Sequence, residues 1–513
     1  MLDAGFVHTY IDTHLEQRQV NKIQHGFPSP RYWSRTDVPV EEIAEDRRRV
    51  RAAGRDSFVN FYVGVPYCIQ TDPGKCGYCL FPVEEFQGNA ALENYFGYVE
   101  READLYREAL SGATLGAVYF GGGTSNLYRE PLYHRLMDLV RGLFPDIAPQ
   151  ADITLEGIPQ LFSRAKMQAI KDSGMNRVSM GIQQVDERLN KLSGRKQTTR
   201  HVVQSLEWAR ELGLAANVDL IFGWPQQTVG TMLKDLQTLV SWNVYDITHY
   251  ELNVGGPTDF ALNRFHELPS TLANLEMYRA SRDFLTDQGY EQITAYNFRK
   301  PGDPAGRGYE EGVNRFLDSM DTVGLGYAAV SFFGNSAIGT DRSWSFINHL
   351  SLPRYKQALE EGRFPVERGF SHEAADWRLA MLFRSLFGLT VNRADYRAAF
   401  GTDVYEEFAT VWDGLGEYGF VEVSDEEVGL VGDGPFYTPM VQALLAEERY
   451  RALRERETRA AQARRAARRA RRTGTDGDGA GTEEVVASPG TGAPADTEAP
   501  ADAEAAAATP ARG

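Results

Sequence analysis

All three cysteines of this 513-residue chain lie within one short segment, at Cys68, Cys76 and Cys79. Three cysteines are too few for a disulfide scaffold, and an odd number of cysteines is typical of reduced thiols. Three thiolates on one loop can hold three irons of a [4Fe–4S] cube and leave the fourth iron open to another ligand. The segment therefore predicts an iron–sulfur loop, and the fold has to present that loop to a substrate.

Two alternatives remain open for this loop. Structural zinc usually takes four Cys or His ligands, and the histidines nearest in sequence, His25 and His134, lie outside the segment. A group of buried free thiols would also give this pattern, because free cysteine often behaves as a small core residue. The long first gap contains the turn signal Asp72-Pro73-Gly74, which is expected to fold the extra residues outward.

From residue 57 onward, short β-rich runs alternate with helical patterns. This order predicts parallel strands joined by crossover helices, and six such units predict an α/β fold with a partial (β/α)6 barrel. The expected strands are 58–63, 117–120, 152–156, 177–181, 217–222 and 246–252. The expected helices between them are 92–110, 131–143, 160–173, 199–212 and 228–242.

Polar residues stand where these strands end. The cysteine loop follows the first strand, and later strand ends carry Gly121–Thr124, Glu156, Gln183 and Asp219. In a parallel barrel the chemistry sits at the carboxyl ends of the strands, so these residues are expected to share one site. Each has an ordinary alternative, because a triple glycine also makes a tight turn and a single charged residue such as Arg195 is often a solvated surface residue.

The rest of the chain divides by composition. We expect a polar lead-in over 1–55, the barrel over 56–335, a smaller α-rich C-terminal domain over 336–455 and a disordered tail over 456–513. The tail is rich in Arg and Ala and then in Gly, Thr, Pro and Asp, so it cannot bury enough apolar surface to fold alone. Its first part could form a solvated helix, and a partner-binding arm is the alternative.

Charge and hydropathy exclude some partners. The formal net charge of -17 argues against nucleic-acid binding, because neutralising phosphates requires a basic face. No run of eighteen or more apolar residues predicts a membrane span, and the first ten residues lack the pattern of a signal peptide. A cytoplasmic location is therefore expected.

Several segments resemble radical S-adenosylmethionine (SAM) enzymes of the oxygen-independent coproporphyrinogen III oxidase type. They keep the family's order from about residue 57 to 335, and this order is specific for the superfamily. Beyond that span the likeness to the family's C-terminal domain is weaker. The matching segments are Tyr62–Cys68, Cys76–Cys79, Tyr119–Thr124, Asn176–Gln183, Gly194-Arg195, Val218–Thr228 and Gly324–Ser331.

The resemblance implies a cofactor set. Cys68, Cys76 and Cys79 would ligate a [4Fe–4S] cluster, and SAM would chelate its fourth iron. Reductive cleavage of SAM would give a 5′-deoxyadenosyl radical, which abstracts hydrogen from a small-molecule substrate. An electron donor such as flavodoxin or ferredoxin is implied as the partner.

The resemblance also implies the residues that contact SAM. Residues matching its methionine end or its other polar groups are Gly122, Gly123, Thr124, Glu156, Gln183, Arg195 and Asp219, and Tyr62 matches a tyrosine near the cluster. Late in the barrel, the candidates for lining a substrate pocket are Tyr296, Asn297, Arg315 and Tyr327.

The chain departs from the family pattern at three places. The first cysteine gap has seven residues where the family has three, and Gly64 stands where the family has histidine. The segment Glu156-Gly157-Ile158-Pro159 replaces the family's Glu-Ala/Cys-Asn-Pro. The missing histidine and the composition of the tail favour one-carbon transfer, which is C-methylation or cyclopropanation of a natural product with one or two SAM molecules. Oxidative decarboxylation of coproporphyrinogen III and a haem carrier on the same fold are the alternatives.

Overall fold

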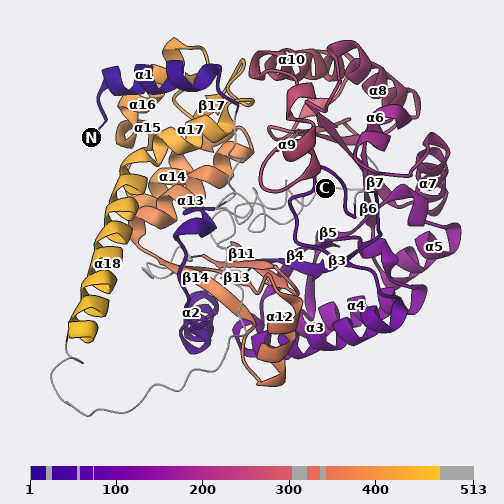
Figure 1. Ribbon diagram of the computed structural model, residues 1–513, viewed down its shortest axis with the longest axis horizontal. Coiled ribbons are helices and arrows are strands. Elements are labelled where there is room, and N and C mark those ends of the chain that lie inside the picture. The colour runs from indigo at the N-terminus through magenta and orange to yellow at the C-terminus, as the bar shows by residue number, and fades with distance from the viewer. Residues whose placement is uncertain are drawn as a thin grey trace, which may run out of the picture.

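The computed structural model describes residues 2–18, 26–54, 58–72, 74–302, 320–334 and 343–473 of the chain. Its largest feature is a twelve-stranded sheet with the order β14-β13-β12-β11-β1-β4-β5-β6-β7-β8-β10-β9. In Figure 1 this sheet curves through the lower and right-hand parts of the molecule, and a helical unit lies at the upper left.

Six parallel strands, each hydrogen-bonded to the next, form the expected partial barrel. They are β1 (Phe58–Val65), β4 (Thr114–Gly122), β5 (Asp146–Gly157), β6 (Arg177–Gln183), β7 (Ala215–Phe222) and β8 (Asp246–Glu251). The connecting helices are α3 (Asn89–Leu110), α4 (Glu130–Leu143), α5 (Arg164–Ser173), α6 (Glu187–Leu192), α7 (Thr199–Leu212) and α8 (Val229–Ser241). Figure 1 shows these helices in a ring outside the strands. The predicted alternation and the partial barrel are confirmed.

Alternation within each strand separates an apolar outer face from a polar inner face. On β6, Val178 and Met180 belong to the large apolar core that includes residues of the surrounding helices. The intervening Ser179 instead hydrogen-bonds Asp219 of β7, with 3.1 Å between Oγ and Oδ2. The barrel interior is therefore lined by polar side chains, which is what a site for a polar ligand requires.

The sheet continues past the six strands at both edges. β11 (Met320–Leu325) pairs in parallel with β1, and the strands β12 (Val330–Phe333), β13 (Ser343–Asn348) and β14 (Val366–His372) follow antiparallel. At the other edge, β10 (Asn297–Arg299) and β9 (Glu291–Gln292) extend from β8. The same sheet therefore crosses residue 335, where a domain boundary was expected, and that division of the chain stays a prediction.

Short elements complete this part of the chain. The helices are α9 (Asp259–Asn263) and α10 (Thr271–Asp287), which come before β9, and α12 (Leu352–Glu360), which joins β13 to β14. The 3-10 turns are η1 (Pro30–Tyr32), η2 (Ser125–Leu127), η3 (Pro159–Leu161) and η4 (Phe265–Glu267). A two-stranded sheet of β2 (Tyr67–Cys68) and β3 (Glu84–Glu85) carries the first cysteine.

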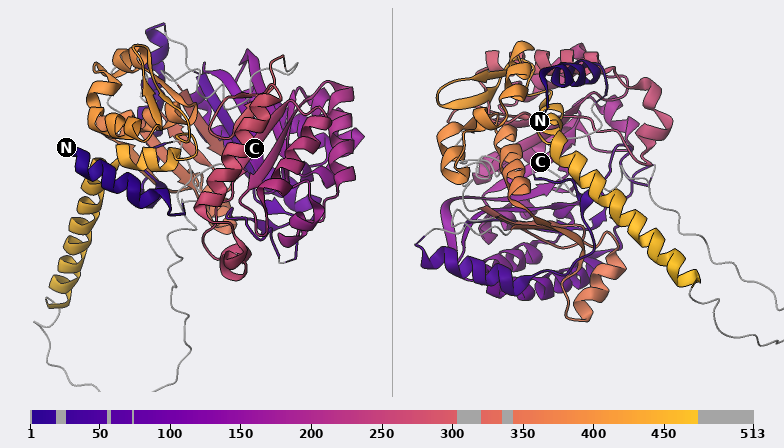
Figure 2. Two further views of the ribbon diagram at one scale, coloured as in Figure 1. Left: turned by 90° about the horizontal axis from the view of Figure 1, so that it is seen from above. Right: turned by 90° about the vertical axis from the view of Figure 1, so that its left-hand side faces the viewer.

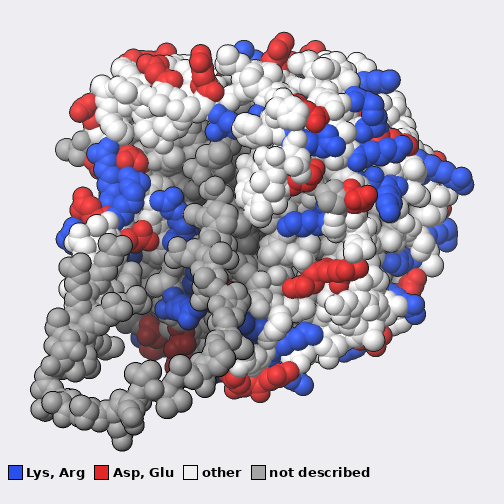
Figure 3. Space-filling view, in the orientation of Figure 1, with Lys and Arg blue, Asp and Glu red and all other residues white. Residues whose placement is uncertain are grey.

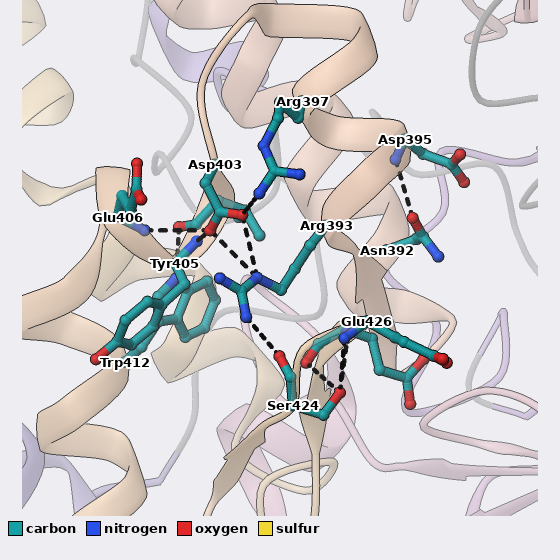
Figure 4. A network of polar contacts seen from close by, with 12 residues as sticks. Asn392, Arg393, Asp395, Arg397, Asp403, Tyr405, Glu406, Trp412, Ser424 and Glu426 are labelled. Atoms are coloured by element: carbon teal, nitrogen blue, oxygen red, sulfur yellow. Dashed lines mark hydrogen bonds and ion pairs between the residues drawn. The ribbon is translucent and has the colours of Figure 1, made fainter.

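A second apolar core, which also includes Phe222 and Met232 of the barrel, holds the C-terminal unit together. Its helices are α13 (Ala374–Phe387), α14 (Arg393–Phe400), α15 (Val404–Glu407), α16 (Ala409–Glu417) and α17 (Thr438–Leu445). Its three-stranded sheet has the order β15 (Thr390–Asn392), β17 (Glu427–Leu430), β16 (Val421–Val423), and β16 and β17 form an antiparallel hairpin. Figure 4 shows one of its polar networks, in which Asp403 lies against Arg393 and Arg397.

The two N-terminal helices pack against different parts of the molecule. α1 (Ala4–Leu15) lies on α16 and α17, and a Cβ on Gly414 would come within 2.5 Å of Val7 Cγ1. α2 (Val40–Ala52) lies on α3, and its buried Arg47 pairs with Asp321 of β11 at 2.9 Å. The expected lead-in is therefore shared between the C-terminal unit and the barrel.

The last described element is α18 (Glu447–Thr473), which extends away from the body in both views of Figure 2. Helical structure thus continues through residues 456–473, where the tail was expected to begin, and it matches the solvated helix considered for that part. Residues 474–513 lie outside the described residues. No helix in the described part of the chain is long and apolar enough to cross a membrane.

Candidate functional site

The cysteine loop leaves the end of β1 and is held by backbone hydrogen bonds. Cys68 lies in β2, which pairs with β3 so that Cys68 stands opposite Glu85. Cys76 and Cys79 lie on one tight turn, in which the Cys79 amide donates to the Cys76 carbonyl at 2.9 Å. All three cysteines are free and partly buried.

The three thiols are close enough to affect one another. Burial raises the pKa of Cys68, and the neighbouring Cys76 raises it further. Burial and then Cys76 raise the pKa of Cys79 to about 12. Thiolates at these positions therefore need a compensating positive centre, and an iron–sulfur cluster supplies one.

The Gly121–Thr124 turn braces the cysteine loop. The Gly123 amide donates to the Val65 carbonyl at 2.7 Å, and the Thr124 amide donates to the Tyr67 carbonyl at 2.9 Å. A Cβ on Gly123 would lie 2.3 Å from the Tyr67 carbonyl oxygen, so only glycine fits there. Thr124 Oγ1 lies 3.1 Å from Cys68 Sγ. These glycines let the loop backbone approach, and their contact with SAM stays a prediction.

The long segment between the first two cysteines is also held in place by packing. Gly194 has a φ of +81°, and a Cβ there would lie 2.4 Å from the Asp72 carbonyl oxygen. The Gly77 amide donates to the Ser193 carbonyl at 3.0 Å. The extra residues between the first two cysteines therefore pack on the segment that leads into Arg195.

Arg195 is buried beside the thiols. Its Nη1 lies 3.3 Å from the Tyr78 hydroxyl, and its Nη2 donates to the Gly181 carbonyl and, at 3.0 Å, to Gln197 Oε1. Burial by itself would lower the pKa of this guanidinium, but Tyr78 and Cys76 raise the pKa above its ordinary value. The surface alternative for Arg195 is wrong, since the residue is 7% exposed.

Two buried carboxyl groups face each other inside the barrel. Burial and the charge of Asp219 raise the pKa of Glu156 well above its ordinary value, although Glu156 accepts a hydrogen bond from the Gly122 amide. Burial raises the pKa of Asp219 to about 7, against hydrogen bonds from Ser179 and Asn217. Arg195 lies near enough to Glu156 to favour its charged form. The strand-end residues and the cysteine loop thus form one continuous site.

The other predicted contacts lie around this centre. Tyr62 is buried on β1, stacked against Tyr119 with 6.3 Å between ring centroids. Gln183, with a φ of 65°, has its amide near Gly181 at the end of β6.

The proposed pocket-lining residues are scattered. Tyr296 packs against Tyr250 with 5.4 Å between centroids, and Asn297 hydrogen-bonds Asp246 in the barrel interior at 2.7 Å. Tyr327 donates to the Leu350 carbonyl at 2.8 Å. Arg315 lies outside the described residues.

Sequence reasoning missed several residues of the site. Tyr78 is partly buried between Trp224 and Phe260, and its hydroxyl lies against Arg195. Ser179 and Asn217 position Asp219. A signal was available for these two, because Ser179 lies two residues before Gly181 and Asn217 two before Asp219, which places them on the inner face.

The donor groups of the site fit a cluster and SAM. In the described part of the chain, no three Cys, His, Asp or Glu side chains converge in the arrangement that binds a single metal ion. A [4Fe–4S] cube takes one thiolate on each iron, so its three ligands need not converge on one point. Glu156 Oε2 and Arg195 Nε are buried without a hydrogen-bond partner among the described residues. An acceptor and a donor are therefore left for the amino and carboxylate groups of a bound amino acid.

Comparison with known proteins agrees with this arrangement. Residues 73–239 match the Radical SAM superfamily. The oxygen-independent coproporphyrinogen III oxidase of Paracoccus denitrificans is 25% identical over 376 residues, which is 69% of this chain and 79% of that protein. The heme chaperone HemW of Escherichia coli is 29% identical over 245 residues, 48% of this chain and 63% of that protein.

The fold also matches a solved structure. Coproporphyrinogen III oxidase (HemN) from Escherichia coli, described as a radical SAM enzyme, superimposes with a TM-score of 0.69. The match covers 82% of this chain and 96% of that one, at 21% sequence identity.

Proposed function

We propose that this chain is an enzyme acting on a coproporphyrinogen-type substrate. The premise is that it belongs to the radical SAM superfamily and resembles the oxygen-independent coproporphyrinogen III oxidases of that superfamily. The observation that carries the proposal is the continuity of one buried site, which runs from the three thiols through Arg195 to Glu156. A structural barrel would not need buried charges so arranged.

Different residues of the site would bind the cluster and SAM. Cys68, Cys76 and Cys79 would hold the cluster, with Thr124 donating to the Cys68 sulfur. Arg195 suits a carboxylate, and the buried Glu156 suits an amino group. When bound and reduced, the two cofactors supply a 5′-deoxyadenosyl radical. Tyr62 and Tyr119 close the inner wall beside Gly122 and exclude water from it.

The comparisons favour oxidative decarboxylation over the one-carbon transfer expected from the sequence. The relatives named above are coproporphyrinogen III oxidases or a heme chaperone, and none of them is a methyltransferase. Gly64 was the main reason for the other expectation. A Cβ there would lie 3.2 Å from both the Tyr327 carbonyl oxygen and Tyr62 Cε1, so a larger residue at this position requires one of these neighbours to shift. The chain would have to orient a porphyrinogen without that side chain.

The test is an anaerobic assay of the reconstituted protein with SAM, dithionite and coproporphyrinogen III. We expect 5′-deoxyadenosine and CO2 from the wild-type protein and neither from Cys76→Ala. S-adenosylhomocysteine formed together with 5′-deoxyadenosine would support one-carbon transfer instead. Bound iron and sulfide without 5′-deoxyadenosine, with or without substrate, would contradict the proposal.

A haem carrier is the second candidate, and the similarity to HemW supports it. It predicts stoichiometric haem binding with a shifted Soret band and no turnover of coproporphyrinogen III. A haem titration of the same preparation separates the two candidates.

A further inference from the structure

Gln197 is a buried glutamine in the short connection between α6 and α7 that also carries Arg195. The side chain is 4% exposed, and both ends of its amide are used. Its Nε2 donates to the Ile182 carbonyl at 2.6 Å, and its Oε1 accepts from Nη2 of Arg195 at 3.0 Å. Because Gln183 follows Ile182, this one amide joins Arg195 to the strand end that carries another predicted SAM contact.

The Ile182 carbonyl is itself held by other parts of the barrel. Asn190 of α6 is 1% exposed, and its Nδ2 donates to this carbonyl at 3.1 Å and to the Gln184 carbonyl at 2.6 Å. Asp235 of α8 accepts from the amides of the two residues that follow Gln184, at 2.7 and 3.1 Å. The backbone at the end of β6 is therefore fixed by α6 and α8, so it gives Gln197 an anchor that does not depend on Gln197 itself.

The contact with Gln197 determines which N–H groups of Arg195 remain for a ligand. The hydrogens of Nη2 are taken by Gln197 and by the Gly181 carbonyl, and Nη1 lies 3.3 Å from the Tyr78 hydroxyl. Nε is buried and has no hydrogen-bond partner among the described residues. The guanidinium is thus held at its outer nitrogens, and Nε is the donor left for a carboxylate.

Arg195 differs from the basic side chains on the neighbouring surface. Figure 3 shows exposed Lys and Arg side chains gathered over the region of α6 and α7, the helices on either side of this connection. An exposed arginine loses conformational entropy when a ligand fixes it. Arg195 is 7% exposed and already held, so that loss accompanies folding and does not weaken the binding of a ligand.

We propose that Gln197 is a positioning residue, which holds Arg195 in the orientation that binds the carboxylate of SAM. The inference rests on the proposed function, in which Arg195 takes that carboxylate. Gln197 acts through Arg195, so it changes the affinity for SAM and leaves the bond that is cleaved unaffected. A buried glutamine with only a structural role would contribute to folding alone, and a ligand that has no carboxylate separates the two roles.

The test compares two ligands by calorimetry on the reconstituted full-length protein. SAM carries the carboxylate, whereas 5′-methylthioadenosine lacks the whole amino-acid group. Gln197→Met keeps the approximate size of the side chain and removes both of its hydrogen bonds. The Kd for SAM is expected to rise about tenfold in this variant, while the Kd for 5′-methylthioadenosine stays within about twofold of the wild-type value. An equal rise for both ligands would overturn the proposal.

Gln227 provides a matched control, because it is another buried glutamine of this region and is 6% exposed. Its Nε2 donates to Gln184 Oε1 at 2.9 Å and its Oε1 accepts from the Trp224 amide at 3.1 Å, and neither bond involves Arg195. Gln227→Met should lower the melting temperature about as much as Gln197→Met and leave the ratio of the two Kd values unchanged. A change in this ratio as large as that in Gln197→Met would assign the effect to packing of the loop and overturn the proposal.

Two further variants test whether Gln197 acts through Arg195. Adding Gln197→Met to Arg195→Lys should change the Kd for SAM by less than about twofold, because the guanidinium that Gln197 holds is already lost. Gln197→Glu places a carboxylate beside Arg195 that competes with the carboxylate of SAM, so the Kd for SAM should rise in this variant even if Gln197→Met does not fold. A further rise of about tenfold in the Arg195→Lys background, or an unchanged Kd in Gln197→Glu, would overturn the proposal.

Kinetics separate this inference from the proposed function. In Gln197→Met, the KM for SAM in the formation of 5′-deoxyadenosine should rise with the Kd, and kcat should stay unchanged. If SAM binding depends on Gln197 as expected but the wild-type protein releases no CO2 from coproporphyrinogen III, the proposed function fails and the positioning role stands. If CO2 is released and the Kd for SAM is the same in the wild-type protein and Gln197→Met, the positioning role fails and the proposed function stands.

Discussion

Two glycines of the site are important because they have no side chain. Gly123 and Gly194 each hold a backbone carbonyl of the cysteine loop at a distance that any Cβ would block. The sequence identified the Gly121–Thr124 turn and the three cysteines, but it could not identify the partner of each glycine. That partner lies more than fifty residues away for Gly123 and more than a hundred for Gly194, and no local pattern encodes such a contact.

Gly123→Ala is expected to displace the cysteine loop, because the new Cβ would lie 2.3 Å from the Tyr67 carbonyl oxygen. Iron and sulfide bound after reconstitution should fall well below the wild-type content. Gly142→Ala on α4 meets nothing within 4 Å and should leave the iron content unchanged while stabilising the helix by about 0.5–1 kcal/mol. Normal iron content in Gly123→Ala would show that the glycine does not brace the loop.

A buried carboxyl group outside the site holds the backbone that follows β11. Glu102 on α3 accepts from the Gly326 amide at 2.7 Å, the Tyr355 hydroxyl at 2.7 Å and the Asn348 amide at 2.6 Å. Despite these donors, burial raises the pKa of Glu102 to about 7. A titration signal in stability is therefore expected from Glu102, which the sequence shows only as an ordinary acidic residue.

The raised pKa makes a prediction about stability and pH. Between the unfolded value of 4.5 and the folded value of about 7, the native state binds more protons, so the free energy of unfolding falls as pH rises through this window. Glu102 contributes up to about 3 kcal/mol to that fall. Urea unfolding from pH 4.5 to 7.5 should show a shallower fall in Glu102→Gln than in the wild-type protein. Glu100→Gln, at a surface pair with Arg135, should keep the wild-type slope.

At the scale of elements, the regular strands and helices were predictable and the short ones were not. The six strands alternate between an apolar outer face and a polar inner face, and helices such as α7 and α8 begin at a threonine cap. β2, β3 and α9 have two to five residues, too few for any periodicity. They nevertheless build the cysteine loop and its outer cover, so the part of the site closest to the cluster was the least predictable.

Asp403 illustrates how one side chain sets the start of an element. It caps α15 by accepting from the Tyr405 amide at 2.8 Å, and it pairs with Arg393 and Arg397 (Figure 4). Asp403→Ala should lower the free energy of unfolding by about 1–2 kcal/mol, because the cap and the charge are both lost. Asp403→Asn keeps the cap and should lose less, as measured by urea unfolding. Equal losses in the two variants would assign the whole effect to the arginines.

At the scale of the whole molecule, segments far apart in sequence complete each other's cores. Val7 and Ile11 of α1 are fully buried in the core of the C-terminal unit, and Arg47 of α2 is buried against β11. Composition alone indicated a polar lead-in, because α1 and α2 expose many polar residues. The few buried positions decide where each helix packs, and their partners come after residue 320.

Deleting residues 1–16 should therefore weaken the C-terminal unit rather than the barrel. Loss of the two buried aliphatic side chains alone removes about 3–6 kcal/mol of burial free energy. Amide hydrogen exchange should become faster in α16 and α17 and stay unchanged in α4. Faster exchange throughout the molecule would mean that the two parts unfold as one unit.

The packing of α1 on α16 has a consequence for synthesis of the chain. Nearly four hundred residues separate the two helices, so at about 5–20 residues per second α1 emerges from the ribosome roughly 20–80 s before its partner exists. During that interval the apolar side of α1 has no native cover, while the strands of the barrel can already assemble in order. Helix α1 is thus made well before it can pack, and its apolar side is a segment of the nascent chain that a chaperone would protect.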